Sequence, residues 1–163
     1  MSAPASTADV FGRTDKNGAN TKQCDRQQLL ISAALQDFDT VRFFIEVRGL
    51  HPDATVNGKP TAICYAALKK DRCLLRYLLL KGASTNIRDR MGMTPLHYAA
   101  LGGCMFCISY LLSSGAHVNA VNMSGKTPLA MALENPRLSN SVRLLKRHGA
   151  KILNVGHMSA HYH

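Results

Sequence analysis

Few residues in this chain have the types and spacing that catalysis or metal binding needs. Cys104 and Cys107 are separated by two residues, a spacing found in zinc sites and redox pairs. A structural zinc site requires two further ligands, and the sequence has no second close cysteine pair. We therefore interpret Cys104 and Cys107 as thiols packed at the start of a helix, with zinc binding and redox chemistry as the alternatives.

Two other motifs resemble catalytic elements only in part. Gly125-Lys126-Thr127 resembles the end of a phosphate-binding loop, but that loop needs glycine at position 120, where this chain has Ala120. His97 could act as a general base, yet no motif places a serine, cysteine or aspartate partner beside it. The three histidines between residues 157 and 163 fit a flexible polar tail better than a metal site. We expect no catalytic site, no metal site and no cofactor.

The most informative pattern is a heptapeptide that returns at a fixed spacing. The segment 94–100, Thr-Pro-Leu-His-Tyr-Ala-Ala, has counterparts 33 residues earlier, at 61–67, and 33 residues later, from residue 127. Gly-Ala pairs that begin at residues 82, 115 and 149 keep nearly the same register. A period of this length is typical of stacked repeats, which offer a long contact surface instead of a deep pocket.

The repeat predicts a pair of helices in each unit. Thr94 suits a helix N-cap and Pro95 the first helical position, while Gly102-Gly103 ends that helix. Apolar residues from Met105 to Leu112 recur at helical spacing and predict a second, antiparallel helix. The segment 117–126 should form an extended finger with a tight turn. The register gives four units, at about 25–56, 57–89, 90–122 and 123–153.

This pattern is similar to that of ankyrin-repeat proteins, and residues 89–116 match it almost position for position. The resemblance covers about 130 of the 163 residues. It implies an all-α solenoid of about four helix-turn-helix repeats with short β-type finger turns, spanning residues 24–153. It also implies that His97 holds turns together through hydrogen bonds to a threonine and to neighbouring backbone, and that the protein is not an enzyme.

The two ends of the chain are expected to lie outside the solenoid. Residues 1–23 are rich in small polar residues without apolar periodicity and predict a disordered tail, with a targeting segment as the alternative. Residues 154–163 form a second tail. No stretch approaches the ~18 apolar residues of a membrane span. Five cysteines without an apolar signal segment favour an intracellular, cytoplasmic protein, with cytoskeletal, ribonucleoprotein or nuclear association left open.

In ankyrin-repeat proteins, partners usually contact the finger tips and the concave face of the first helices. Transferred by register, this implies a partner-binding set: Lys59, Tyr65, Leu68, Lys69, Arg90, Met91, Met93, Tyr98, Leu101, Met123 and Lys126. We expect four of these to anchor the partner: Met91, Met93, Tyr98 and Leu101. Tyr65 and Tyr98 are one repeat apart and should stand side by side, where packing between repeats explains them as well as binding does.

The charge of the chain is uneven. Residues 1–53 carry six basic and seven acidic residues, residues 54–163 carry fourteen and three, and residues 91–125 carry none of either sign. An uncharged unit between basic ones indicates an apolar contact centre with a positive rim, unless the central unit is simply more buried. A basic surface favours an acidic partner.

We therefore expect a non-catalytic interaction module, an adaptor or structural subunit of a multisubunit assembly that binds an acidic protein surface. The alternative is a component of a ribonucleoprotein or chromatin complex whose basic repeats contact RNA or DNA phosphates. Neither a membrane nor a small-molecule substrate is expected as a partner.

Overall fold

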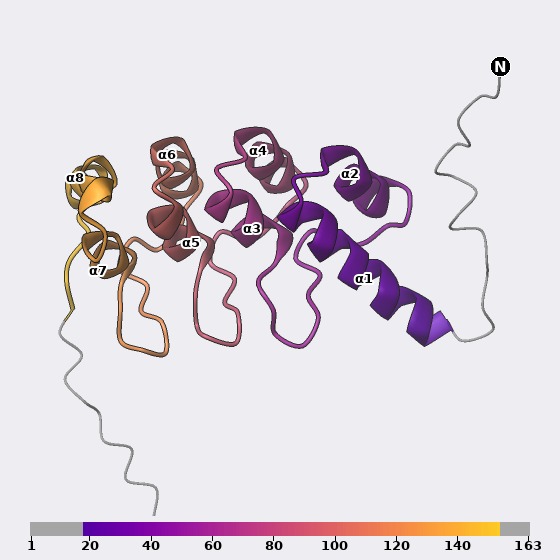
Figure 1. The fold of residues 1–163 in the computed structure, drawn as a ribbon. Helices are drawn as coiled ribbons and strands as arrows, with labels where there is room; N and C mark the ends of the chain where they lie inside the picture. Colours follow the sequence, from indigo (N-terminus) through magenta and orange to yellow (C-terminus); the bar gives the residue numbers. More distant parts are fainter. Residues whose placement is uncertain (1–17, 154–163) are drawn as a thin grey trace, which may run out of the picture.

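Four antiparallel helix pairs stack side by side in a computed structural model that describes residues 18–153, with side chains from residue 21 onward (Figure 1). The inner helices α1, α3, α5 and α7 pack against one another in sequence, and each is covered by an outer partner, α2, α4, α6 or α8. The elements are α1 (Gly18–Ala34), α2 (Phe38–Glu46), α3 (Ala62–Leu68), α4 (Arg72–Leu80), α5 (Pro95–Gly102), α6 (Met105–Ser113), α7 (Pro128–Leu133), the short 3-10 helix η2 (Pro136–Leu138) and α8 (Ser139–Arg147). No strand forms between residues 18 and 153, so the expected all-α solenoid is confirmed.

The ends of the inner helices follow the residue types that the repeat supplies. Thr94 has extended backbone and Pro95 opens α5, where a missing N–H has no helical acceptor to lose. Gly103 closes α5 in the left-handed conformation, with φ of 74°. Thr127 starts α7 in the same way, and its hydroxyl accepts a hydrogen bond from the Ala130 amide at 3.2 Å.

The core lies between the two rows of helices. Ile63, Leu96 and Leu129 hold the same register position in α3, α5 and α7, and all three side chains are buried in line. Alanines at 66–67 and 99–100 are also fully buried, and their small side chains let neighbouring inner helices approach closely. The repeated heptapeptide thus places one buried side chain of each inner helix in a continuous apolar row.

A ladder of polar side chains joins consecutive repeats on the loops that follow the outer helices. Three residues spaced 33 apart each accept a hydrogen bond from a backbone amide one repeat further along the chain. The bonds run from Ser84 to Asp53 at 3.0 Å, from His117 to Asn86 at 2.8 Å and from Lys151 to Asn119 at 2.7 Å. These bonds tie each unit to its neighbour in addition to the apolar contacts.

The N-terminal boundary differs from the expected one. Helix α1 begins at Gly18, so residues 18–23, assigned above to a disordered tail, are helical. An ion pair between Arg48 and Asp25, 2.7 Å apart, fixes α1 against the loop after α2. The rest of that tail and the C-terminal histidines lie outside the described residues. No helix in the described part of the chain is long and apolar enough to cross a membrane.

Candidate functional site

Three finger turns project from the same edge of the stack, between the outer helix of one pair and the inner helix of the next (Figure 1). Their tips are joined by backbone hydrogen bonds: the Arg90 amide donates to the Gly58 carbonyl at 2.8 Å, and the Met123 amide donates to the Met91 carbonyl at 2.9 Å. We call residues 57–59, 90–92 and 123–125 the finger row. The 33-residue period therefore places residues from three repeats on one continuous surface.

The fingers stand close because of their glycines. A Cβ on Gly92 would lie 3.0 Å from the Met123 nitrogen, closer than side-chain carbons normally approach, and its φ of 70° is unfavourable for other residues. Asp89 then holds its own finger, since one of its oxygens accepts the amides of Met91 and Met93. Asn122 repeats this arrangement one finger later.

The two tyrosines on the inner helices differ in their partners. The Tyr98 hydroxyl donates to the Asp89 carboxylate at 2.5 Å, and burial together with this bond raises the pKa of Tyr98 far above its usual value. One repeat earlier, Val56 stands where Asp89 stands, and its hydrocarbon side chain has no atom that could accept a hydrogen bond from Tyr65. Burial raises the pKa of Tyr65 as well, with smaller contributions from Cys64 and Asp89. The Tyr98 hydroxyl is therefore already hydrogen-bonded within its own repeat, whereas Tyr65 has no carboxylate at the position equivalent to Asp89.

Tyr65 lines a hollow of about 190 Å³ between α1 and the first finger. Its walls are mostly apolar, with Lys59 at one side. The hollow exists because no finger precedes the first unit: Ile31 occupies the register position of His97 and is 43% exposed, whereas His97 is covered. Its walls are Gln27, Leu30, Ile31, Ala34, Val56, Lys59 and Tyr65.

The expected apolar anchors divide into exposed and buried side chains. Met91 is 53% exposed, Met123 77% and Leu101 44%. Met93 is only 8% exposed, because its sulfur packs under the next finger and accepts a hydrogen bond from the Asn122 side-chain amide at 3.3 Å. The structure thus brings Met91 and Met123 together on the finger row and places Met93 in the packing beneath it. Leu68 is half-buried at the end of α3.

The expected basic residues also differ in how their charge is used. Lys59, Lys69 and Arg90 are exposed and form no ion pair within residues 21–153. Lys126 is exposed but forms an ion pair with Glu134, so its charge is already balanced. The finger row therefore presents exposed methionines beside two uncompensated cations, Lys59 and Arg90.

His97 is buried and holds neighbouring fingers together. Its Nε2 lies 3.1 Å from the Lys126 carbonyl, which can only accept, so Nε2 carries the proton. Its Nδ1 then accepts from the Thr94 amide at 3.1 Å. Burial lowers the pKa of His97, which keeps the ring neutral. The role implied by the family pattern is the one that these contacts provide, and both ring nitrogens are already occupied.

The cysteine pair differs from the interpretation made above, because Cys104 and Cys107 form a disulfide instead of two packed thiols. The other three cysteines, Cys24, Cys64 and Cys73, are free. Within the described residues, no group of three or more histidine, cysteine or acidic side chains could hold a metal ion.

Comparison with known proteins agrees with the geometry. A family model described as ankyrin repeats, in three copies, matches residues 63–155. No curated protein matches the chain.

Proposed function

The chain belongs to the ankyrin-repeat family, whose repeats are protein–protein interaction modules, and on that premise we propose that it is an adaptor or structural subunit of an intracellular multisubunit assembly. It binds an acidic protein surface through the finger row and the adjoining hollow, and carries out no catalysis. The observation that carries the proposal is the alignment of exposed methionines with uncompensated cations along three joined fingers.

Met91 and Met123 form the apolar centre of this contact. They are exposed on adjacent fingers whose backbones are hydrogen-bonded, so a partner meets both at once. Unbranched methionine side chains adapt to irregular surfaces, and a few buried apolar anchors carry most of the energy of a typical interface. Leu101, which is exposed on α5, is a further apolar contact in this proposal.

The hollow beside Tyr65 accommodates a protruding side chain of the partner. At about 190 Å³ it is smaller than the pockets that enclose whole small molecules, and this favours one inserted residue over a free ligand. The Tyr65 hydroxyl then supplies a hydrogen bond that Tyr98, bound to Asp89, does not offer.

Lys59 and Arg90 favour a partner whose contact surface is negatively charged. Cations at the edge of an apolar contact accelerate encounter with a negative surface more than they raise the final affinity. Net charge of the same sign extends along the chain, since residues 54–163 carry fourteen basic and three acidic residues.

The proposal is tested first by crosslinking in cells with a lysine-reactive reagent. Mass spectrometry then identifies the proteins that are joined to Lys59. The selected neighbour is then purified and titrated against variants of the full chain. We expect Met91→Asp combined with Met123→Asp to weaken binding at least ~30-fold, because a buried carboxylate replaces an apolar anchor. Lys59→Glu combined with Arg90→Glu should slow association about tenfold at low salt.

Matched controls lie on the outer helices. Met105→Asp changes a methionine that is 49% exposed on α6, and Arg143→Glu reverses an exposed charge on α8. Both should bind as the unmodified protein does. Normal binding by the finger-row variants would show that the surface is wrongly assigned. Tight binding of a mixed-sequence RNA with a steep salt dependence, in place of the protein neighbour, would favour a nucleic-acid role.

A further inference from the structure

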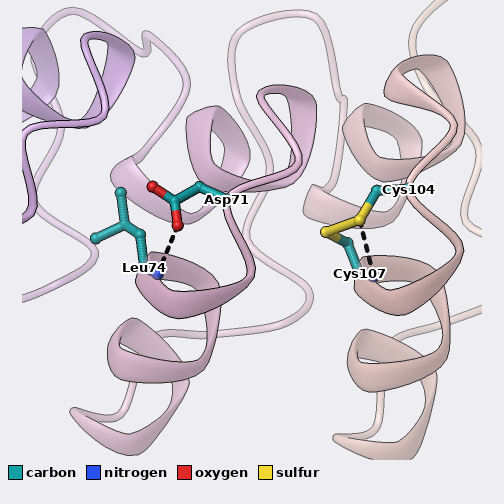
Figure 2. Close-up of a disulfide and its surroundings, with 4 residues drawn as sticks. All are labelled: Asp71, Leu74, Cys104 and Cys107. Carbon is teal, nitrogen blue, oxygen red and sulfur yellow. Dashed lines mark hydrogen bonds between the residues drawn. A yellow bond between two sulfur atoms is a disulfide. The ribbon is translucent and has the colours of Figure 1, made fainter.

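The outer helices begin with a cap that changes chemistry in the third repeat. Asp71 caps α4, and its Oδ1 accepts the Leu74 amide at 3.0 Å. Cys104 holds the same position 33 residues later, and its sulfur accepts the Cys107 amide at 3.2 Å. Figure 2 shows the two caps side by side, a carboxylate in one repeat and a sulfur in the next. The third repeat therefore carries a redox-active atom where the second carries a fixed charge.

Cys107 is placed to react with that sulfur. The two Cα atoms are 5.2 Å apart across the first turn of α6, within the range that a disulfide spans, and the sulfurs are bonded. At the corresponding place in α4 the residue is Leu74, a packed apolar side chain. Pairing in the third repeat thus results from two substitutions at one helix turn.

We propose that Cys104 and Cys107 form a reversible dithiol–disulfide site that exchanges with low-molecular-weight thiols and disulfides of the glutathione class. In the reducing direction a thiolate attacks the Cys104 sulfur, the bond between the two cysteine sulfurs breaks, and Cys107 leaves as a thiolate. A second thiolate then attacks the external sulfur of the mixed disulfide and releases Cys104. In total, two external thiols are oxidised to one disulfide, and their two protons end on the two cysteines.

The two cysteines differ in access, and this sets the order of the steps. Cys104 is 5% exposed and Cys107 is fully buried. The residues between them, Met105 and Phe106, are 49% and 38% exposed, so this turn lies at the surface. Attack therefore occurs at Cys104, and Cys107 is the residue that closes the ring again.

The reduced state is stabilised by the same helix start. The Cys104 sulfur holds the place of the Asp71 carboxylate and accepts the Cys107 amide at the positive end of α6, a contact that does not require the bond to Cys107. On the exposed side of this turn, the Arg72 guanidinium of the preceding repeat lies over the Phe106 ring, 5.3 Å from its centre. Both states of the pair are thus compatible with the fold, as a reversible site requires.

The test uses the full chain with Cys24→Ser and Cys73→Ser, which removes the two exposed free thiols. Protein is equilibrated in mixtures of reduced and oxidised glutathione, quenched, alkylated and weighed by mass spectrometry. We expect the pair to change from disulfide to dithiol within the accessible range of mixtures, as one two-electron step in which 29.6 mV corresponds to a tenfold change in the equilibrium. Cys64 serves as an internal control, since burial raises its pKa to about 12 and keeps it unreactive.

Two single variants separate attack from ring closure. Cys107→Ser should accumulate one glutathione on Cys104, and Cys104→Ser should accumulate at least tenfold less, because Cys107 is buried. Cys104→Asp restores the cap of the second repeat and shows by circular dichroism whether loss of the thiol alone disturbs the fold. If either serine variant fails to fold, the glutathione titration of the intact pair still tests whether the disulfide is reversible.

Three results would overturn the proposal. If Cys104 and Cys107 remain free thiols in every mixture, they are packing residues and not a redox pair. A disulfide that persists in the most reducing mixture would make the bond purely structural. Equal glutathione uptake by both serine variants would refute attack at Cys104.

Discussion

Replacing His97 by alanine should separate two neighbouring fingers. The ring accepts a hydrogen bond from the Thr94 amide and donates one to the Lys126 carbonyl, and the side chain is fully buried. Each bond contributes about 1 kcal/mol, and a buried partner left unpaired costs about 1–3 kcal/mol more. We therefore expect His97→Ala to lower the free energy of unfolding by about 2–4 kcal/mol, a large part of the stability of a small domain.

The matched control is Cys64→Ala. Cys64 holds the position of His97 one repeat earlier and is equally buried, but among the described residues its side chain has only a local hydrogen bond with Thr61, at 3.6 Å. We expect Cys64→Ala to lower the free energy of unfolding by about 1 kcal/mol or less, since it loses one weak hydrogen bond. Both variants are measured by urea denaturation, followed by circular dichroism, at pH 7.5 under reducing conditions. Equal losses for the two variants would refute the bridging role of the histidine.

The pH dependence tests the same contact independently. Because burial lowers the pKa of His97, its contribution to stability is present above the unfolded value of about 6.5 and is lost as the pH falls toward the folded pKa. One proton changes the free energy of unfolding by at most about 1.4 kcal/mol per pH unit. The difference in stability between the unmodified protein and His97→Ala should therefore shrink as the solution is acidified below pH 6.5. A difference that stays constant from pH 7.5 to 5 would contradict a neutral, buried ring.

Two further predictions concern turns and the polar ladder. Gly103→Ala should cost about 1–2 kcal/mol, because φ is 74° and the end of the Leu138 side chain, whose Cδ2 would lie 2.4 Å from the new Cβ, must move aside, whereas Gly115→Ala, with φ of 90° and open space, should cost about 1 kcal/mol. Urea denaturation of both variants measures the difference, and equal costs would contradict the steric argument. Asn86→Ala removes the bonds to the His117 amide and the Gly115 carbonyl and should cost about 1–2 kcal/mol. Amide hydrogen exchange at His117 should rise in that variant, and unchanged protection would count against the ladder.

Much of the fold could be predicted from the repeat because each unit obeys the same local rules. Thr94, Pro95 and Gly103 mark helix ends by backbone chemistry alone, and the in-line burial of Leu96 follows from the register. The start of α1 could not be predicted in this way. Residues 18–23 have no apolar periodicity, and the ion pair of Asp25 with Arg48 joins positions 23 apart in sequence.

The candidate site was predictable in position but not in exposure. Register placed Met91 and Met93 on one finger, but the hydrogen bond from Asn122 of the next finger to the Met93 sulfur forms only in the folded stack. The neutralisation of Lys126 by Glu134 likewise depends on side-chain reach. Asp89 was missed as the acceptor for Tyr98, although an acid just before a finger turn is a signal for this kind of cap.

The sequence shows the spacing of the two cysteines, but it does not show that they form a disulfide. A gap of two residues occurs in zinc sites, redox pairs and packed helices, and the absence of a second close pair made packed thiols the favoured interpretation. The decision comes from the helix phase, which puts both sulfurs of Cys104 and Cys107 on the same side of the first turn of α6.

The amide ladder of Asp53, Asn86 and Asn119 has a mechanical consequence. Each rung joins only adjacent units, so tension applied between the two ends acts on the rungs in series. The array should therefore yield in discrete steps, each freeing one unit of 33 residues, about 110 Å of extended chain. Force spectroscopy on the full chain should show these steps when the two ends are pulled apart and shortening of the chain when the force is released.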